Sequence, residues 1–369
     1  MKRNSIQDIF QNGFDGVKAT TVLPVHCNRA GTAITKCRTG AYGHHIESCE
    51  QGCTQQVRYH SCHHRSCPQC NALPRERWLE AQRTRLLDCA HYHIVFTLPA
   101  ALRRFWRYHK AEVADDIFRA AKEALLRLCR KSLYLGGTPG ILAGFHSWSR
   151  TLDDHPHLHC LVSAEGITEQ GEWVKAKREC FLPGKLLMAT FRVLLLRRWL
   201  RRNAQGQWHA ALGDPACLEV ALKRQYAQGW HVQVQPRYRH GRGVAVYLAR
   251  YLRGGPCHAR QVQRDAAGRV LFTPKRGERK AGVRHFTEAG FIERYLAHVP
   301  PHRQRMVRGY GVYAGQGRAV ALRNASRPVE APEPRQRSGV AEIPFVRCPH
   351  CGEPLQRPSL PWLLPHGPP

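Results

Sequence analysis

Acidic residues are scarce in this sequence. Its 369 residues include 27 Asp and Glu against 57 Lys and Arg, which gives a formal net charge of +30 with all 22 His neutral. Neutralising phosphates releases counterions, so a chain this basic favours nucleic acid as its partner. Carboxylates are especially sparse in the segments with strand character, which argues against a magnesium enzyme built on an acidic triad.

Long apolar runs are missing as well. The longest such stretch, residues 181–200, is interrupted by Pro183 and by several basic residues. It falls far short of the ~20 apolar residues that a membrane span needs, so we expect neither a transmembrane helix nor a membrane partner. The basic N-terminus is followed by no apolar core or cleavage site of a secretory signal. A cytoplasmic, nucleoid-associated protein is therefore expected.

The length predicts two to three domains at roughly 150 residues each, and no internal repeat is visible. Residues 1–88 hold seven of the 15 cysteines and predict a small zinc-binding module. Residues 89–322 predict the main domain, with a helical basic insertion near 166–226. Residues 323–369 are typical of a Pro-rich linker followed by a CxxC tail.

The cysteines are expected to bind metal rather than to form disulfides, because the cytoplasm is reducing. A structural zinc site needs two ligand pairs about 10–20 residues apart, and the pairs Cys49/Cys53 and Cys67/Cys70 have that arrangement. Cys62 or a neighbouring His could replace Cys53. Cys37 together with a nearby His hints at a second ion. The isolated pair Cys348/Cys351 needs partners from elsewhere to close a site.

Strands and helices follow from apolar periodicity along the main domain. Strands are predicted over 91–99, 140–148, 155–163 and 230–238, with shorter ones over 270–274 and 283–287. Helices are predicted over 101–134, around 191–202 within the insertion, over 244–253 and over 288–299. The second and third strands are separated by an acidic turn and predict a hairpin.

Two pairs of side chains in this domain are candidates for metal binding and for catalysis. In the segment HPHLH, His157 and His159 lie on one face of a strand, since side chains alternate, and that geometry suits one divalent cation. Tyr247 and Tyr251 lie four residues apart on one helical face. Such a pair of tyrosines is more often part of an apolar core. Here, however, basic residues surround the pair, which suits a surface that contacts phosphates. These basic residues are Arg239, Arg242, Arg250 and Arg253.

The order of five segments resembles one known family. These are YHSCHHRSCPQC, HIVFTLP, HSWSRTLDDHPHLHCLVS, YLARYLRGGP and FIERYLAHVPPHRQRMVRGYG. The sequence is similar to the rolling-circle, two-tyrosine insertion-sequence transposases, which belong to the HUH endonucleases and carry an N-terminal zinc-binding domain. The resemblance implies an α+β fold in which a small zinc-binding module precedes an antiparallel sheet flanked by helices.

The same resemblance implies a mechanism. His157 and His159 would bind Mg²⁺ or Mn²⁺, with a third ligand from His146 or His155, of which His146 ranks slightly ahead. Tyr247 and Tyr251 would be the nucleophiles that cut a DNA strand through a 5′-phosphotyrosine intermediate and rejoin it. The substrate would be single-stranded or hairpin DNA at the ends of the element, together with target DNA. Structural Zn²⁺ would be held by the cysteine block, with ligands among Cys49, Cys53, Cys62, Cys67 and Cys70.

Other functions fit parts of the pattern. A plasmid relaxase or a rolling-circle replication initiator would keep the chemistry, whereas a zinc-dependent DNA-binding protein would lack catalysis. A zinc nucleobase deaminase is set aside, because the HxE at residues 45–47 is followed by no PCxxC. Three tryptophans near the basic insertion predict either base stacking or core packing: Trp199, Trp208 and Trp230.

Overall fold

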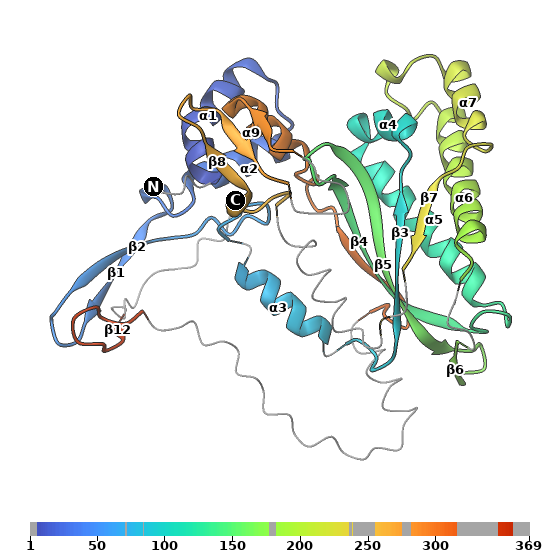
Figure 1. The fold of residues 1–369 in the computed structure, drawn as a ribbon, viewed down its shortest axis with the longest axis horizontal. Coiled ribbons are helices and arrows are strands. Elements are labelled where there is room, and N and C mark those ends of the chain that lie inside the picture. Colours follow the sequence, from blue (N-terminus) through green and yellow to red (C-terminus); the bar gives the residue numbers. More distant parts are fainter. Residues whose placement is uncertain are drawn as a thin grey trace.

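The structure is a computed structural model that describes residues 6–70, 72–83, 85–176, 182–235, 238, 255–274, 282–315 and 346–356. Antiparallel sheets and helices build this part of the chain, so the expected α+β class is confirmed. Figure 1 shows a sheet lobe, a helical lobe that contains the N-terminal helices, and a thin arm that projects from the helical lobe. No helix in the ranges above is both long and apolar enough to cross a membrane.

The sheet lobe is organised by one large antiparallel sheet. Its strands lie in the order β11-β4-β5-β3-β7, and β6 pairs with one end of β5. The strands are β3 (His91–Thr97), β4 (Thr138–Trp148), β5 (Asp154–Ile167), β6 (Trp173–Lys175), β7 (His231–Val234) and β11 (Val307–Gly311). The predicted hairpin is β4–β5, and the predicted strands over 91–99 and 230–238 correspond to β3 and β7.

Helices cover one face of this sheet (Figure 1). Alternate side chains of the strands, such as Phe96, Phe145 and Leu158, are buried against them in the largest apolar core. The helices are η2 (Ala100–Leu102), α4 (Arg103–Tyr108), α5 (Lys110–Cys129), α6 (Gly184–Ala204), η3 (Ala210–Leu212) and α7 (Pro215–Arg224). One continuous helix was expected over 101–134, but the backbone at His109 has φ −132° and ψ 56°, which separates α4 from α5.

The basic segment around α6 is not a peripheral surface feature. Phe191, Leu195 and Trp199 of α6 are fully buried in the main core, and the ring of Phe191 lies 4.8 Å from that of Phe96 in the sheet. Trp230 is also buried, and Trp208 packs against Trp199 at 5.5 Å. The base-stacking alternative is therefore wrong for the buried Trp199 and Trp230, whereas Trp208 is only partly buried.

The helical lobe joins the beginning of the chain to a distant segment. It contains α1 (Ile6–Thr20), α2 (Val25–Lys36), η4 (Ala259–Gln261), β8 (Val262–Arg264), β9 (Val270–Phe272), β10 (Arg284–Phe286) and α9 (Glu288–Ala297). The ring of Phe10 meets the ring of Tyr295 edge-on at 5.4 Å, and the Tyr295 hydroxyl donates to the backbone oxygen of Ser66 at 2.8 Å. The two segments thus share one apolar core.

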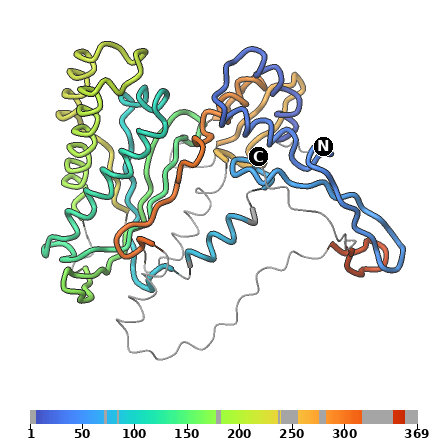
Figure 2. The backbone as a smooth tube through the Cα atoms, turned by 180° about the vertical axis from the view of Figure 1, so that it is seen from behind, coloured from blue at the N-terminus to red at the C-terminus, as the bar shows by residue number. Residues whose placement is uncertain are grey.

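The arm is a small sheet made from both ends of the described chain. β1 (His44–Cys49) follows η1 (Gly40–Tyr42), and it pairs with β2 (Gln55–Tyr59) on one side and with β12 (Leu355–Gln356) on the other. In Figure 2 the C-terminal strand, in red, lies against the far end of the blue arm. The remaining helix, α3 (Ala72–Arg83), leads from the cysteine block to the sheet lobe.

The packing of α2 on α1 yields a stability prediction. A Cβ atom at Gly31 would lie 2.2 Å from Cζ of the buried Phe14 ring, so Gly31→Ala should destabilise the protein by about 1–3 kcal/mol through overpacking. Gly16 is exposed on α1 and has nothing near its Cβ position, so Gly16→Ala should be neutral or stabilising. Thermal unfolding of both variants checks the pair. Equal melting temperatures would contradict the packing described.

Candidate metal centres

Three groups of metal-binding side chains occur among the described residues. Two contain four cysteines each and the third contains three histidines, and within each group the ligand atoms lie within 4.8 Å of one another. The groups are Cys37, Cys62, Cys67 and Cys70; Cys49, Cys53, Cys348 and Cys351; and His146, His157 and His159.

The first cysteine group lies where the helical lobe meets the arm. Cys37 follows α2, and Cys67 and Cys70 form a turn that leads towards α3. The Sγ atom of Cys70 lies 3.5 Å from that of Cys37 and 3.6 Å from that of Cys62. Thiolates bound to one tetrahedral Zn²⁺ at 2.3 Å lie about 3.8 Å apart, whereas disulfide sulfurs lie about 2.05 Å apart. The donor set and its spacing therefore fit zinc.

The grouping of cysteines differs from the sequence expectation. Cys67 and Cys70 were expected to share an ion with Cys49 and Cys53, but the structure completes their group with Cys37 and Cys62. Cys49 ends β1 and Cys53 precedes β2, so both lie at the turn of the β1–β2 hairpin, and Cys348 and Cys351 lie beside them. The two cysteine pairs are separated because the β1–β2 hairpin is long, and its turn lies far from the turn that contains Cys67 and Cys70.

The histidine group lies on the sheet face opposite α5 and α6. His146 on β4 is directly paired with His157 on β5, and His159 is two residues further along β5 on the same face. The ring centroids lie 5.3 Å apart for His146 and His157 and 4.7 Å apart for His157 and His159. The predicted strand geometry thus brings both histidines of the HPHLH segment to one point, with His146 as the third member.

Hydrogen bonds fix the orientation of two of these imidazoles. His157 Nδ1 donates to its neighbouring backbone oxygen at His155 over 2.6 Å, so the lone pair of the neutral ring is on Nε2. His93 Nδ1 donates to Gln235 Oε1, and its Nε2 therefore accepts from His159 Nδ1, each over 2.9 Å. His159 in turn offers Nε2. Such outer partners orient metal-ligating histidines in general.

Burial keeps these imidazoles uncharged at neutral pH. It lowers the pKa of His157 to about 4 and the pKa of His159 well below its ordinary value, and neighbouring histidines lower the latter further. A neutral imidazole is the form that binds a cation. The alternative third ligand, His155, is instead engaged by Arg103, whose Nη2 donates to His155 Nδ1 over 3.0 Å.

Gln235 and His93 were not assigned to the site from the sequence. For His93, the alternation of side chains along its strand could have indicated it. Alternation along residues 91–97 places His93 on the same sheet face as the histidine group, since β3 pairs with β5. Gln235 lies just beyond β7 and also accepts a hydrogen bond from the Tyr238 hydroxyl at 2.9 Å. Its role depends on strand order, which the sequence does not specify.

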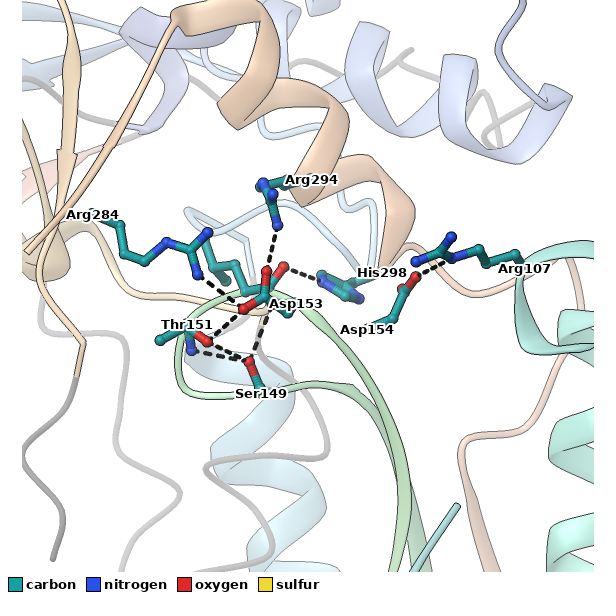
Figure 3. Close-up of polar contacts among 9 residues, drawn as sticks. Arg107, Ser149, Thr151, Asp153, Asp154, Arg284, Arg294 and His298 are labelled. Atoms are coloured by element: carbon teal, nitrogen blue, oxygen red, sulfur yellow. Dashed lines mark hydrogen bonds and ion pairs between the residues drawn. The ribbon is translucent and has the colours of Figure 1, made fainter. Parts of the chain in front are cut away.

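The turn between β4 and β5 is held by a charged cluster (Figure 3). Asp153 accepts from Arg284 at 2.9 Å and from Arg294 at 2.6 Å, and both arginines belong to the helical lobe. His298 accepts from the Ser147 hydroxyl and donates to the backbone oxygen of Leu152. These contacts fix the end of the hairpin that carries the histidine group against the helical lobe.

The expected nucleophiles and arginines cannot be placed. Tyr247 and Tyr251 lie outside the described residues, and so do the four arginines expected to contact DNA: Arg239, Arg242, Arg250 and Arg253. Their roles therefore remain predictions from the sequence.

The fold is of the α+β class, and its two groups of four cysteines have the donor set and spacing that fit structural zinc. Comparison with known families then matches residues 9–98 to the family described as "Transposase zinc-binding domain" (Zn_Tnp_IS91) and residues 140–320 to the family described as "Putative transposase" (Y2_Tnp). The chain belongs to this transposase family, as the resemblance predicted.

Two relatives extend this match over most of the chain. The "Putative transposase y4qJ" of Sinorhizobium fredii is 33% identical over 328 residues, which cover 86% of this chain and 82% of the relative. The "Transposase for insertion sequence element IS801" of Pseudomonas savastanoi pv. phaseolicola is 28% identical over 301 residues, which cover 77% of this chain and 70% of the relative. No solved structure gives a significant match.

The hydrogen bonds around His93 predict a metal-affinity effect. Gln235→Leu removes the acceptor that orients His93 and, through it, His159, so Mn²⁺ affinity should fall about 10–100-fold. Gln233 is exposed on the same strand, which makes Gln233→Leu the matched control. Calorimetric titration of the full chain with Mn²⁺ measures both. If the two variants bind equally well, Gln235 does not position the site.

The Asp153 cluster predicts a pH-dependent contribution to stability. Burial opposes ionisation of Asp153, but hydrogen bonds from Thr151 and Arg294 and the charges of both arginines outweigh it and lower the pKa. The stabilisation is therefore present above the ordinary pKa of 3.8 and is lost as pH falls through the lower folded value. Asp153→Asn should lower the melting temperature by about 1–3 °C at pH 7.

This deficit should shrink towards zero in acid below pH 3.8, where the wild-type carboxyl also becomes neutral. Asp15→Asn is the control, because Asp15 is 87% exposed and, within the described ranges, forms an ion pair only with nearby Lys18 on the same helix. Thermal unfolding from pH 7 to pH 2.5 gives the comparison. A deficit that stays constant with pH would mean that charge on Asp153 is not the cause.

Proposed function

We propose that this transposase nicks and rejoins single DNA strands through a 5′-phosphotyrosine intermediate during rolling-circle transposition. The observation that carries the proposal is the group formed by His146, His157 and His159 on the sheet face opposite α5 and α6. Three imidazoles on paired strands would form a cation site that leaves coordination positions for a phosphate. The site would work in the cytoplasm, at the nucleoid.

The chemistry is a transesterification. Mg²⁺ or Mn²⁺ held by the three histidines would stabilise negative charge on the scissile phosphate. The hydroxyl oxygen of Tyr247 or Tyr251 attacks phosphorus and loses its proton, and the 3′ oxygen leaves and takes up a proton. The products are a 5′-phosphotyrosine and a free 3′-hydroxyl, and the reverse step rejoins the strand. Two tyrosines allow a second cut while the first remains covalently linked to DNA.

A cavity next to the histidine group supports a single-stranded substrate. Trp148 stacks on His146 with ring centroids 5.0 Å apart, and it lines a cavity together with Trp78, Arg303 and Arg305. Aromatic rings stack on unpaired bases, and arginines contact the phosphates between them. The net charge of +30 favours the same polyanionic partner. Single-stranded or hairpin DNA at the ends of the element is the substrate that these features suit.

Covalent adducts test this proposal. Purified protein is incubated with Mn²⁺ and labelled single-stranded oligonucleotides that tile the ends of the element, and the products are separated on denaturing gels. We expect adducts that need the divalent cation and that disappear in the Tyr247→Phe, Tyr251→Phe double variant. His159→Ala should reduce adduct formation at least 100-fold, because the cation site is lost.

Tyr108→Phe serves as the matched control, because Tyr108 is exposed on α4 and stacks on His209, which is not among the proposed ligands. It should form adducts at the wild-type rate. Tight, salt-sensitive DNA binding without any adduct, in the presence of either cation, would overturn the proposed cleavage and leave a DNA-binding protein without catalysis.

A further inference from the structure

The tip of the arm contains the second cysteine group, formed by residues from opposite ends of the sequence. Cys49 Sγ lies 3.4 Å from Cys351 Sγ, across a sequence separation of 302 residues. All four cysteines are free of disulfide bonds, and their Sγ atoms lie within 4.8 Å of one another. Four thiols at this spacing match the edges of a tetrahedral Zn²⁺–thiolate site, which are about 3.8 Å long.

Each pair of cysteines lies on a tight turn. Cys49 ends β1, and the chain reverses through Gly52, at φ +71°, so that the Cys49 amide donates to the Thr54 backbone oxygen over 3.0 Å. The second pair repeats this pattern with Gly352 at φ +79°, where the Cys348 amide donates to Glu353 over 2.7 Å. The positive φ values explain the use of glycine at both turns. The two turns thus present two thiols each towards a common point.

Among the described residues, few other contacts hold the segment 346–356 to the arm, and one of them is a hydrogen bond from Gln356 Nε2 to Glu50 Oε2 at 3.0 Å. β12 pairs with β1 through only two residue pairs, Ser48 with Gln356 and Cys49 with Leu355. The buried apolar cluster at this place consists of Cys49, Cys348 and Leu355. Three side chains are far too few for a stable apolar core, and small modules of this kind generally need a bound metal or disulfides.

We propose that a second structural Zn²⁺ ion, bound by Cys49, Cys53, Cys348 and Cys351, fastens the C-terminal segment to the arm of the N-terminal zinc-binding module. Two of its ligands lie beyond both matched family segments, which end at residues 98 and 320. The site is separate from the group that contains Cys37 and Cys62. It is independent of the proposed DNA cleavage, since it shares no residue with the histidine group.

Metal content tests the stoichiometry. The full chain, purified without chelator and freed of loosely bound metal, should contain two Zn²⁺ per chain by mass spectrometry. The Cys348→Ser, Cys351→Ser double variant should contain one, and Cys217→Ser should contain two, because Cys217 is exposed on α7 and belongs to neither group. Replacement by Co²⁺ should show the same change, as a halved thiolate-to-metal absorption band in the double variant.

Thiol reactivity gives a second readout that does not depend on the variants folding. Cys53, Cys217 and Cys351 are all exposed, so burial predicts that N-ethylmaleimide modifies all three at similar rates. Zinc binding predicts that, of these three thiols, only Cys217 reacts in the native full chain, and that Cys53 and Cys351 become reactive once a chelator removes the metal. One Zn²⁺ per native chain, or equal reactivity of the three thiols before chelation, would overturn the proposal.

Discussion

The antiparallel pairing of β4 with β5 is the constraint on which the rest of the structure depends. Its register places His146 opposite His157 and Phe145 opposite Leu158. Because side chains alternate along a strand, one register directs the aromatic and aliphatic side chains into the core under α5 and α6 and directs the histidines to the other face. A shift by one residue would turn the histidines towards α5 and α6 and move the apolar side chains to the opposite face, so fold and site are specified by the same set of backbone hydrogen bonds.

The hairpin also determines how the two lobes are joined. Its turn inserts Asp153 between two arginines of the helical lobe, and Leu152 is buried in the apolar core of that lobe. The core of the helical lobe already unites α1 and α2 with α9. The segment that precedes the sheet in the sequence and the segment that follows it are therefore held against the same end of the histidine-bearing strands. The cysteine block is tied to that assembly through the bond from Tyr295 to Ser66.

The sequence predicts the local part of this arrangement well. The HPHLH segment, the hairpin and the strand over 91–99 are recognised because alternation and β-branched residues act over a few residues. The partners of Cys49, the separation of α4 from α5 at His109 and the burial of Trp199 depend on contacts between distant segments. The resemblance to a known family predicted the zinc-binding module and the antiparallel sheet, but it did not specify which cysteines belong to the same group. Tyr247 and Tyr251 lie outside the described residues, so the sequence remains the basis for their role.

The contact between α1 and α9 has a consequence for synthesis. Phe10 leaves the ribosome long before its partner Tyr295. At about 5–20 residues per second, the roughly 280 residues between them take on the order of 15–60 s to translate. During that interval the apolar faces of both N-terminal helices have no native partner from α9 to cover them. The core that unites α1, α2 and α9 can therefore be completed only after α9 has been translated.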